Sequence, residues 1–307
     1  MKTKKKGSVI ILVIALSLAL LGTFLLYNEI TKSAIYDSSK IIGGVKSKNI
    51  INNVETVINK LFETDLTPGY DWKEDFWNYS PVIVFTIDGV SVRVFFSDED
   101  SKINANQIIY PDGKINSLIQ KKISNILRNY DIQEELSNTI IDWIDADNEN
   151  MHLGAEIDYY QTTPFKLSCP NNEMTSPDEL KLLKGLGVYF DGNDTVDLNG
   201  YITVFGDNLY NINTVSPEVL SSFDFLDEVE IEAIINFRKD YPVKNISDMP
   251  KFIPELQKKS FELIDGYLKT TSDIIRIEIQ TEYSGVKLDY VWIYDKTQKK
   301  VLYKQFK

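Results

Sequence analysis

The chain has 307 residues, enough to bury a full hydrophobic core and to form one or two globular domains. Asp and Glu number 45 against 33 Lys and Arg, so the net charge of −12 argues against nucleic acid as a partner. The single cysteine, Cys169, excludes an internal disulfide, and the single histidine, His152, leaves almost nothing for a zinc site or a histidine base, so we expect a protein that is not an enzyme.

The N-terminus carries signals for membrane insertion. Residues 2–6 read Lys-Thr-Lys-Lys-Lys, and residues 9–27 form an uncharged run rich in Leu, Ile, Val and Ala. As a helix this run would span roughly 28 Å, about the thickness of the hydrocarbon core of a membrane. The lysines predict a cytoplasmic N-terminus and an exported body. Composition alone fits a generic signal peptide or signal anchor, but no small-residue cleavage site follows the run.

Gly7 stands directly between the lysines and the apolar run. This arrangement resembles the class III signal of type IV pilins and pseudopilins, which prepilin peptidase cleaves after the glycine, so that Ser8 would begin the mature chain with a methylated amine. Most members of that family carry glutamate at the fifth mature position, where Leu12 stands here. A carboxylate in hydrocarbon is costly without a partner, so its absence suits a subunit with nothing above it. This departure resembles the K-type tip subunit of type II secretion.

A helical pattern continues beyond the apolar run. Apolar residues recur at intervals of three and four from Ile30 to Phe62, with Gly43 and Gly44 at a point where the helix could kink or break. A mostly helical segment from Val9 to Phe62 would span roughly 80 Å, half in lipid and half amphipathic. This is the shape of a pilin stem, although the pattern alone also permits a coiled-coil stalk.

Two groups of β-rich segments flank a mainly helical region. Residues 82–87 and 90–96 are separated by Asp88-Gly89, a strong signal for a two-residue hairpin. Residues 274–283, 287–294 and 301–306 form the second group near the C-terminus. Strands, a helical block and further strands predict an α+β fold, in which both groups pair in one small antiparallel sheet across a large all-α insert.

Several segments of the insert carry a family resemblance, among them Asp100-Ser-Lys-Ile-Asn-Ala-Asn106, Ile141-Asp-Trp-Ile-Asp-Ala-Asp147 and Gly154-Ala-Glu-Ile-Asp-Tyr-Tyr160. Their order and spacing are similar to those of K-type minor pseudopilins of the type II secretion system, in which a large helical domain is inserted into the pilin sheet. The resemblance implies five parts of the chain: a prepilin leader at 1–7, a transmembrane and stem helix at 8–67, a first part of the sheet at 68–100, the inserted helical domain at 101–270 and a second part of the sheet at 271–307.

The same resemblance implies partners and a location. Such a subunit initiates the pseudopilus at its tip with I- and J-type minor pseudopilins and supports the export of folded proteins. It is a substrate of prepilin peptidase, contacts the inner-membrane assembly platform, and spans the inner membrane once with a cytoplasmic N-terminus and a periplasmic body. A minor pilin of a type IV pilus, which shares the signal, is the alternative.

Residues 212–249 resemble the helix-hairpin-helix units of DNA-uptake proteins. In DNA-binding versions two hairpin glycines let backbone amides approach a phosphate. Here those positions hold Phe225 and Asp227, while Asp224 and Glu228 add negative charge. A membrane-anchored DNA receptor is therefore the less favoured alternative, and we expect helix-hairpin-helix-like units that pack protein against protein, without nucleic acid.

Five acidic residues in a short stretch are candidate metal ligands: Asp145, Asp147, Glu149, Glu156 and Asp158. The first three stand at alternate positions and Glu156 lies eleven residues after Asp145, which matches positions one, three, five and twelve of a calcium-binding loop. Asn150 replaces the glycine of position six, so this is no regular EF-hand, and the spacing alone is equally typical of a solvated acidic turn. K-type pseudopilins bind calcium in their helical domain, so the resemblance implies a structural calcium ion here.

Overall fold

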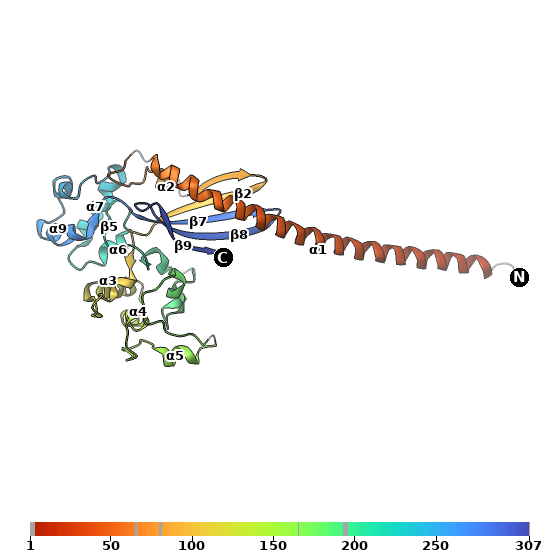
Figure 1. The fold of residues 1–307 in the computed structure, drawn as a ribbon, viewed down its shortest axis with the longest axis horizontal. Helices are drawn as coiled ribbons and strands as arrows, with labels where there is room; N and C mark the ends of the chain where they lie inside the picture. The colour runs from red at the N-terminus through yellow and green to blue at the C-terminus, as the bar shows by residue number, and fades with distance from the viewer. Residues whose placement is uncertain (1–3, 65–66, 80–81, 165, 193–195, 307) are drawn as a thin grey trace.

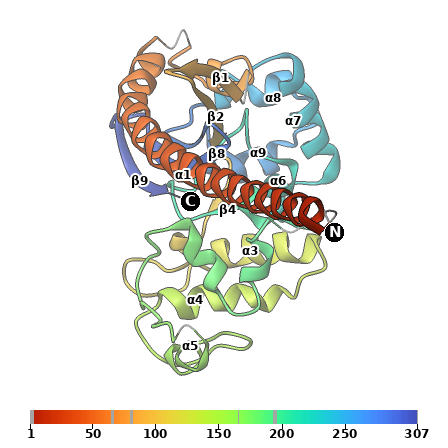
Figure 2. The ribbon, with the colours of Figure 1, turned by 90° about the vertical axis from the view of Figure 1, so that its right-hand side faces the viewer.

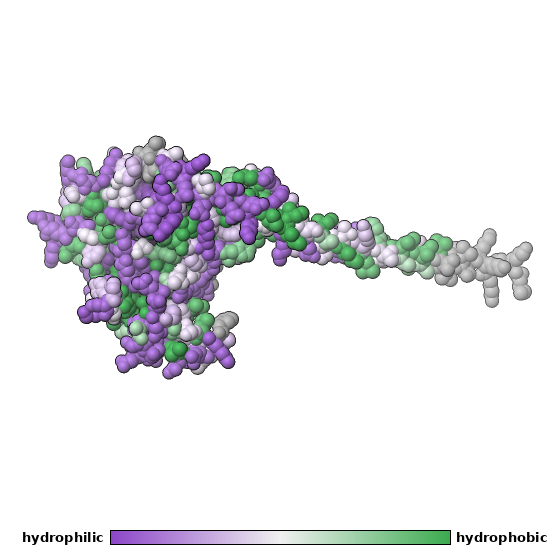
Figure 3. Space-filling model, in the orientation of Figure 1, coloured by the Kyte–Doolittle hydropathy of each residue, from purple (hydrophilic) through white to green (hydrophobic). Residues whose placement is uncertain are grey.

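One long helix and one sheet form the frame of the protein. The computed structural model describes residues 4–64, 67–79, 82–164, 166–192 and 196–306. Helix α1 (Lys4–Glu63) begins near the N-terminus, projects from the body and then lies along the sheet (Figures 1 and 2). It is long and apolar enough to cross a membrane: the best window between Val13 and Glu63 has a mean hydropathy of 1.8 and is 0% buried. Figure 3 shows the apolar character of much of the projecting part.

The sheet has five antiparallel strands in the order β1-β2-β7-β8-β9: β1 (Val82–Ile87), β2 (Val90–Asp98), β7 (Ile274–Tyr283), β8 (Val286–Asp295) and β9 (Lys300–Phe306). Strands β2 and β7 pair from Ser91 opposite Glu282 to Asp98 opposite Ile275. The predicted pairing of the two strand groups across the insert is therefore confirmed.

Two tight turns set the register of the hairpins. Asp88 and Gly89 join β1 to β2 with φ angles of 50° and 79°, and Ser284 and Gly285 join β7 to β8 with 49° and 81°. Two consecutive positive φ angles are the mark of the type I′ turn, whose twist matches that of the strands. The hairpin predicted at Asp88-Gly89 is confirmed, and glycine at the second position avoids steric strain.

One face of the sheet packs against the C-terminal part of α1. The core between them is formed by apolar side chains of α1, α2 (Phe76–Tyr79) and the three strands β2, β7 and β8: Ile50, Ile51, Val54, Ile58, Trp77, Val90, Val92, Val94, Phe96, Ile275, Ile277, Ile279, Trp292 and Tyr294. Alternate residues of each strand enter this core, as the pleat requires. Fully burying an apolar side chain of this size contributes about 1.5–3 kcal/mol, so this face anchors the helix.

Helix α1 continues through Gly43 and Gly44, so the break that the sequence suggested there is absent. The Tyr283 ring lies beside Gly43: a Cβ atom at Gly43 would lie 3.4 Å from a carbon of that ring, an ordinary van der Waals distance. Beside it, Lys46 Nζ donates a hydrogen bond of 2.8 Å to the carbonyl of Asp88. The helix thus passes beside both hairpin turns, and the two glycines do not interrupt it.

The insert between β2 and β7 consists of short helices and irregular chain. Its α-helices are α3 (Ser117–Asn129), α4 (Asn138–Ile144), α5 (Ile157–Thr162), α6 (Pro217–Ser221), α7 (Glu228–Asp240), α8 (Met249–Phe252) and α9 (Lys258–Ile264). Its 3-10 helices are η1 (Ala105–Ile108), η2 (Glu134–Ser137), η3 (Pro177–Leu182), η4 (Gly187–Tyr189), η5 (Leu198–Gly200), η6 (Ile246–Asp248) and η7 (Asp265–Tyr267).

The insert is not all-α, and this part of the prediction is wrong. Two short parallel ladders pair β3 (Ile103–Asn104) with β4 (Ile202–Thr203) and β5 (Tyr210–Asn211) with β6 (Leu268–Lys269). Strands of two residues have no room for an alternating pattern, so periodicity cannot reveal them. Asparagine side chains support the ladders, since Asn208 Oδ1 accepts the Asn104 N–H at 2.8 Å.

Buried aspartates hold the two ends of the insert together. Asp98 ends β2, and its Oδ2 accepts hydrogen bonds of 2.5 Å from the hydroxyls of Thr214 and Ser272. Asp71 accepts the Ser272 N–H at 2.7 Å and forms an ion pair of 2.6 Å with Lys296. Ser272, two residues before β7, is thus fixed to the end of β2.

Asp100 strengthens the same junction. Its Oδ2 accepts the N–H groups of Asp273 at 2.5 Å and Ile274 at 3.2 Å and pairs with Lys269 Nζ at 2.8 Å. Burial and the neighbouring charge of Asp100 raise the pKa of Asp98 to about 7. Carboxylates cost free energy when buried, but hydrogen bonds and a cation compensate part of that cost here.

The insert has its own hydrophobic core, and a lysine lies inside it. Lys122 of α3 is 1% exposed, and its Nζ lies 3.7 Å from the centroid of the Phe223 ring, 4.7 Å from that of Tyr210 and 4.6 Å from that of Tyr267. Desolvation by burial lowers the pKa of Lys122 to about 7. Three aromatic faces thus take the place that a carboxylate would usually hold.

We expect Lys122→Met to leave the free energy of unfolding unchanged at pH 7 or to raise it by up to about 2 kcal/mol. Methionine keeps the ring contacts and removes the cost of burying an ammonium group, while the lost cation–π attraction is about 2 kcal/mol. Chemical unfolding of the chain in mild detergent measures the change. Lys121→Met is the control, because Lys121 is exposed and pairs with Asp224 at the surface. A loss above about 2 kcal/mol in the Lys122 variant alone would mean that the cation–π contacts dominate.

Candidate metal centre

Three carboxylates converge where α4 ends and α5 begins. Asp142 lies in α4, Asp145 follows its last residue, and Glu156 precedes α5. One oxygen of each lies within 4.8 Å of an oxygen of the other two. Like charges at this separation repel each other unless a proton or a cation lies between them.

The intervening loop is folded around these carboxylates. The Asp142 carboxylate accepts the Met151 N–H, with 3.1 Å to Oδ2, and Asn150 Oδ1 accepts the Glu156 N–H at 3.0 Å. Gly154 lies so close that a Cβ atom there would be 2.0 Å from Asp142 Oδ2. Glycine is therefore required at this position if the loop is to close over Asp142.

Several oxygens of the cluster are buried without a hydrogen-bond partner in the described residues: Asp145 Oδ1 and both carboxylate oxygens of Glu156. Burial, followed by the charge of Asp147, raises the pKa of Asp145 to about 6. Burial, followed by the charge of Asp145, raises the pKa of Glu156 to about 7. Buried carboxylate oxygens without partners are costly, so the cluster has the donor set of a site for a hard divalent cation.

The structure brings together two of the five predicted ligands. Asp145 and Glu156 belong to the cluster, whereas Asp147, Glu149 and Asp158 lie outside it and are exposed. Asp147 Oδ1 instead accepts the N–H of Glu149 at 2.8 Å, a turn of the chain that leaves the Glu149 side chain in solvent. The five residues therefore do not act together as the ligands of a regular calcium-binding loop, because the chain between Asp145 and Glu156 turns its acidic side chains away from the cluster.

Asp142 is the member of the cluster that sequence reasoning missed. It stands three residues before Asp145, which is about one helical turn. The end of α4 therefore places both side chains on the same side of the helix. That spacing was available as a signal, but the calcium-loop spacing was counted from Asp145 onward and so left Asp142 out. Asn150, at the position of the expected glycine, acts through its side chain as the acceptor for Glu156 N–H.

The predicted processing site lies in α1. Gly7 and Ser8 are helical in backbone, within the first turns of a helix that begins at Lys4. Residues 1–3 of the predicted leader lie outside the described residues.

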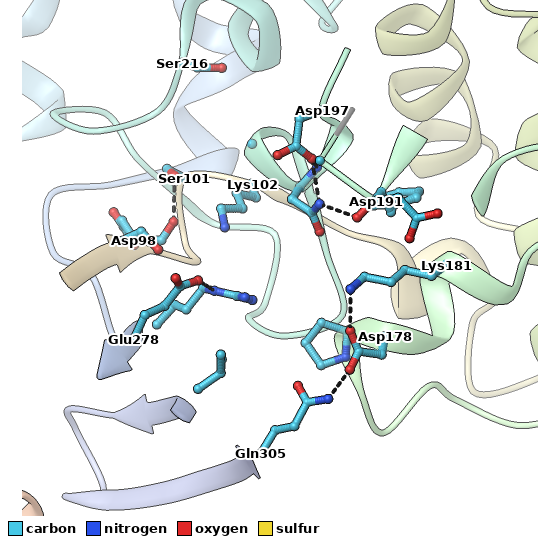
Figure 4. A pocket seen from close by; sticks show the side chains of 18 of the residues that line it. Asp98, Ser101, Lys102, Asp178, Lys181, Asp191, Asp197, Ser216, Glu278 and Gln305 are labelled. Carbon is cyan, nitrogen blue, oxygen red and sulfur yellow. Dashed lines mark hydrogen bonds and ion pairs between the residues drawn. The ribbon is translucent and has the colours of Figure 1, made fainter. Parts of the chain in front are cut away.

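Apart from the carboxylate cluster, a hollow of about 610 Å³ lies between the sheet and the insert. In Figure 4 Lys181, Asp178 and Gln305 form a chain of polar contacts across it, from η3 of the insert to β9. Arg276 in the wall pairs with Glu278 at 2.7 Å. Because these charges are satisfied within the wall, we regard this hollow as part of the joint between insert and sheet.

Comparisons with known proteins agree with this architecture. Residues 101–205 match the family model described as type II secretion system (T2SS), protein K. The type II secretion system protein K of Pectobacterium carotovorum subsp. carotovorum is 25% identical over 198 residues, which cover 61% of this chain and 60% of that protein. The chain therefore matches about 60% of the length of this relative.

A solved structure shares the fold. A chain of the crystal structure of the GspK-GspI-GspJ complex from the enterotoxigenic Escherichia coli type 2 secretion system superposes with a TM-score of 0.66 at 14% identity, covering 90% of this chain and 99% of that one. The apolar N-terminal helix and the antiparallel sheet with its large insert are thus the fold of that solved chain, and the insert carries the sequence match to protein K of type II secretion. Over residues 101–205 the chain is similar to the family of type II secretion system protein K.

The cluster predicts an unusual dependence of stability on pH in the absence of metal. In the folded chain the pKa of Asp145 is about 6 and that of Glu156 about 7, whereas unfolded carboxyls titrate near about 4. The folded state then binds more protons than the unfolded state between about pH 4 and 7, so the contribution of the cluster to stability falls as pH rises. Unfolding in EDTA should show this fall in the native chain relative to Glu156→Gln, which cannot ionise. A difference that is flat or rises across the window would contradict the cluster.

Substitutions can separate the structural cluster from the regular loop spacing. Calcium at about 100 times its Kd should raise the free energy of unfolding by roughly 2.7 kcal/mol. We expect Asp145→Asn and Glu156→Gln to abolish this gain and Glu149→Gln and Asp158→Asn to retain it. Calcium titration followed by thermal unfolding provides the measurement. Equal losses in all four variants would favour the regular loop.

Proposed function

We propose that the chain is the tip subunit of the type II secretion pseudopilus, where it initiates assembly with other minor pseudopilins and supports export of folded proteins. The observation that carries this proposal is the position of the insert, which extends the body beyond the end of α1 that is farther from the N-terminus (Figure 1). Within a filament, bulk at that end would collide with the body of the next subunit. At the tip no subunit follows.

Leu12 supports the same position. In related pilins a glutamate at this place is thought to neutralise the amino terminus of the subunit above, and a carboxylate without such a partner is costly in hydrocarbon. A tip subunit has no subunit above it and needs no glutamate. A minor pilin of a type IV pilus remains the alternative, but the family match favours secretion.

The proposed neighbours are I- and J-type minor pseudopilins. In the related crystal structure GspK, GspI and GspJ form one complex. In this chain α1 exposes apolar side chains against which other stem helices could pack: Ile30, Ile35, Tyr36, Ile41, Ile42 and Val45. We also propose prepilin peptidase and the inner-membrane assembly platform as partners, and no nucleic acid.

The proposed location is the inner membrane. Lysines before the apolar part of α1 favour a cytoplasmic N-terminus, and a single span then places the body in the periplasm. The helix-hairpin-helix-like units would serve there as packing modules. Asp227 fits this role, since its carboxylate caps α7 through the N–H of Glu230 at 2.8 Å and is engaged within the fold.

The proposed cofactor is a structural calcium ion held by Asp142, Asp145 and Glu156. When bound it would supply positive charge and tie the end of α4 to the start of α5. We assign no catalytic role. In support, burial raises the pKa of Cys169 to about 11, so this thiol stays protonated, and His152 is exposed.

Processing provides the decisive test of the class. On co-expression with prepilin peptidase we expect the chain to begin at Ser8 with a methylated amine, measured by mass spectrometry of the intact protein. Gly7→Ala should slow cleavage strongly, whereas Gly22→Ala, which leaves the junction unchanged and meets open space, should be cut normally. An uncut native chain, or a cut near residue 27, would exclude the pseudopilin role.

A further inference from the structure

Strand β1 forms one open edge of the sheet. Among the described residues it pairs with β2 alone, and no backbone hydrogen bond from another element reaches residues 83–87. In a two-residue hairpin the residues that flank the turn bond each other, so Ile87 bonds Val90 and the pattern then alternates along the strand. The N–H and C=O groups of Val84 and Thr86 therefore point away from β2, toward solvent.

This edge lacks the charged side chains that usually protect a sheet from pairing with another chain. Every residue of β1 is uncharged, in the order Val-Ile-Val-Phe-Thr-Ile, and Val84 is 62% exposed. The opposite edge differs, because β9 carries Lys300 and Lys304 and the hydroxyl of Tyr303 lies 2.9 Å from that of Ser176 in the insert. Of these two edges, β1 is the one left open to a further strand.

An apolar groove of about 530 Å³ lies between β1 and α1. Ile83, Phe85 and Ile87 line it from β1, and Val57, which is 54% exposed, lines it from α1. Figure 3 shows apolar surface around the place where α1 meets the body. Because side chains alternate between the two faces of a sheet, a strand added beside β1 places every second side chain on the α1 side, next to this groove.

The lining of the groove selects an uncharged occupant. It contains one base and one acid, Lys46 and Asp88, at the end nearest the hairpin turn. Lys46 Nζ is engaged, because it donates a hydrogen bond of 2.8 Å to the Asp88 carbonyl and lies 4.5 Å from the centroid of the Tyr283 ring. The other lining residues are apolar apart from Asn49 and Asn53. A charged side chain seated beyond that end would lose water without gaining a counter-ion.

We propose that β1 accepts a β-strand of another protein, whose uncharged apolar side chains at alternate positions enter the groove between β1 and α1. The backbone groups of Val84 and Thr86 select an extended segment over a helix, and the groove selects its side chains. A second copy of the chain is a poorer occupant, since an antiparallel pair of β1 strands in one sheet would point the two N-terminal helices in opposite directions. This inference depends neither on the calcium ion nor on the pseudopilus role.

The test uses the full chain in phosphatidylcholine nanodiscs and fluorescein-labelled peptides in which valine alternates with threonine, followed by fluorescence anisotropy. One peptide is N-methylated at every valine and the other at every threonine. Each modification removes the donors from one edge of the peptide and prevents the peptides from pairing with one another. We expect one peptide to bind and the other not, because a single edge of the peptide faces β1. Its affinity should not weaken as salt rises from about 0.1 to 1 M.

Variants of the chain assign the binding to β1 and the groove. Val84→Pro removes an outward N–H without removing a bond to β2, and Val57→Asp places a charge in the groove, so each should weaken binding by at least roughly tenfold. Val84→Thr keeps the backbone donor and Val188→Asp changes an exposed residue elsewhere, so both should bind as the native chain does.

Equal binding of the two methylated peptides would overturn the proposal, because the edge of β1 would then take no part. Equal binding by all variants, no binding at all, or preference for a labelled helical peptide of leucine and glutamine would overturn it as well. A dimer of the native chain in sedimentation that Val84→Pro abolishes would make the occupant a second copy and would contradict the proposal in the same way.

Discussion

The pairing of β2 with β7 is the constraint on which the rest of the structure depends. The chain leaves the sheet after Asp98 and returns at Ile274, and the two strands still match in register. Closing so long a loop costs entropy, but this cost grows only with the logarithm of loop length, so a large insert is tolerated if its ends are held together. Asp98 and Asp100 hold them, through Ser272 and the N–H groups that begin β7. Without this junction the sheet would divide, and α1 would lose half of the surface on which it packs.

Because the ends are fixed, the insert is free to build its own core and carry features that the sheet could not. The sheet core is built from alternate strand residues and one side of α1, and its buried side chains are apolar apart from the Trp and Tyr polar atoms. Short helices, in contrast, end often, and each end presents backbone and side-chain groups without partners in the helix. The carboxylates of the candidate metal centre lie at two such ends, the last residues of α4 and the start of α5.

The sheet could be predicted almost residue by residue, because Asp88-Gly89 and Ser284-Gly285 are turn sequences and separate runs of apolar and β-branched residues, which favour strands. The sequence failed where the determining contact lies far along the chain. Gly43 and Gly44 resemble helix breakers, yet α1 runs through both and packs its later turns on the sheet, and the β3–β4 ladder joins residues about a hundred positions apart. At the metal centre, spacing identified Asp145 and Glu156 but also Glu149, which points into solvent. Asp142 was hidden in an apolar helical pattern, since periodicity reports burial and not the direction of one carboxylate.

The metal centre and the aspartate junction show how the same chemistry leads to opposite consequences. Both contain buried carboxylates in an acidic chain, and burial raises the pKa of Asp98 as it does that of Glu156. At the junction Lys269 and Lys296 supply fixed positive charge, and nearby hydroxyl and N–H groups bond Asp98 Oδ2 and Asp100 Oδ2, although Asp100 Oδ1 has no partner in the described residues. At the metal centre both Glu156 oxygens lack a partner in the described residues, and no described lysine or arginine forms an ion pair with the cluster. A network whose cations belong to the chain stabilises the fold without any added ion, whereas the proposed calcium site would make the order of the α4–α5 loop depend on the ions around it.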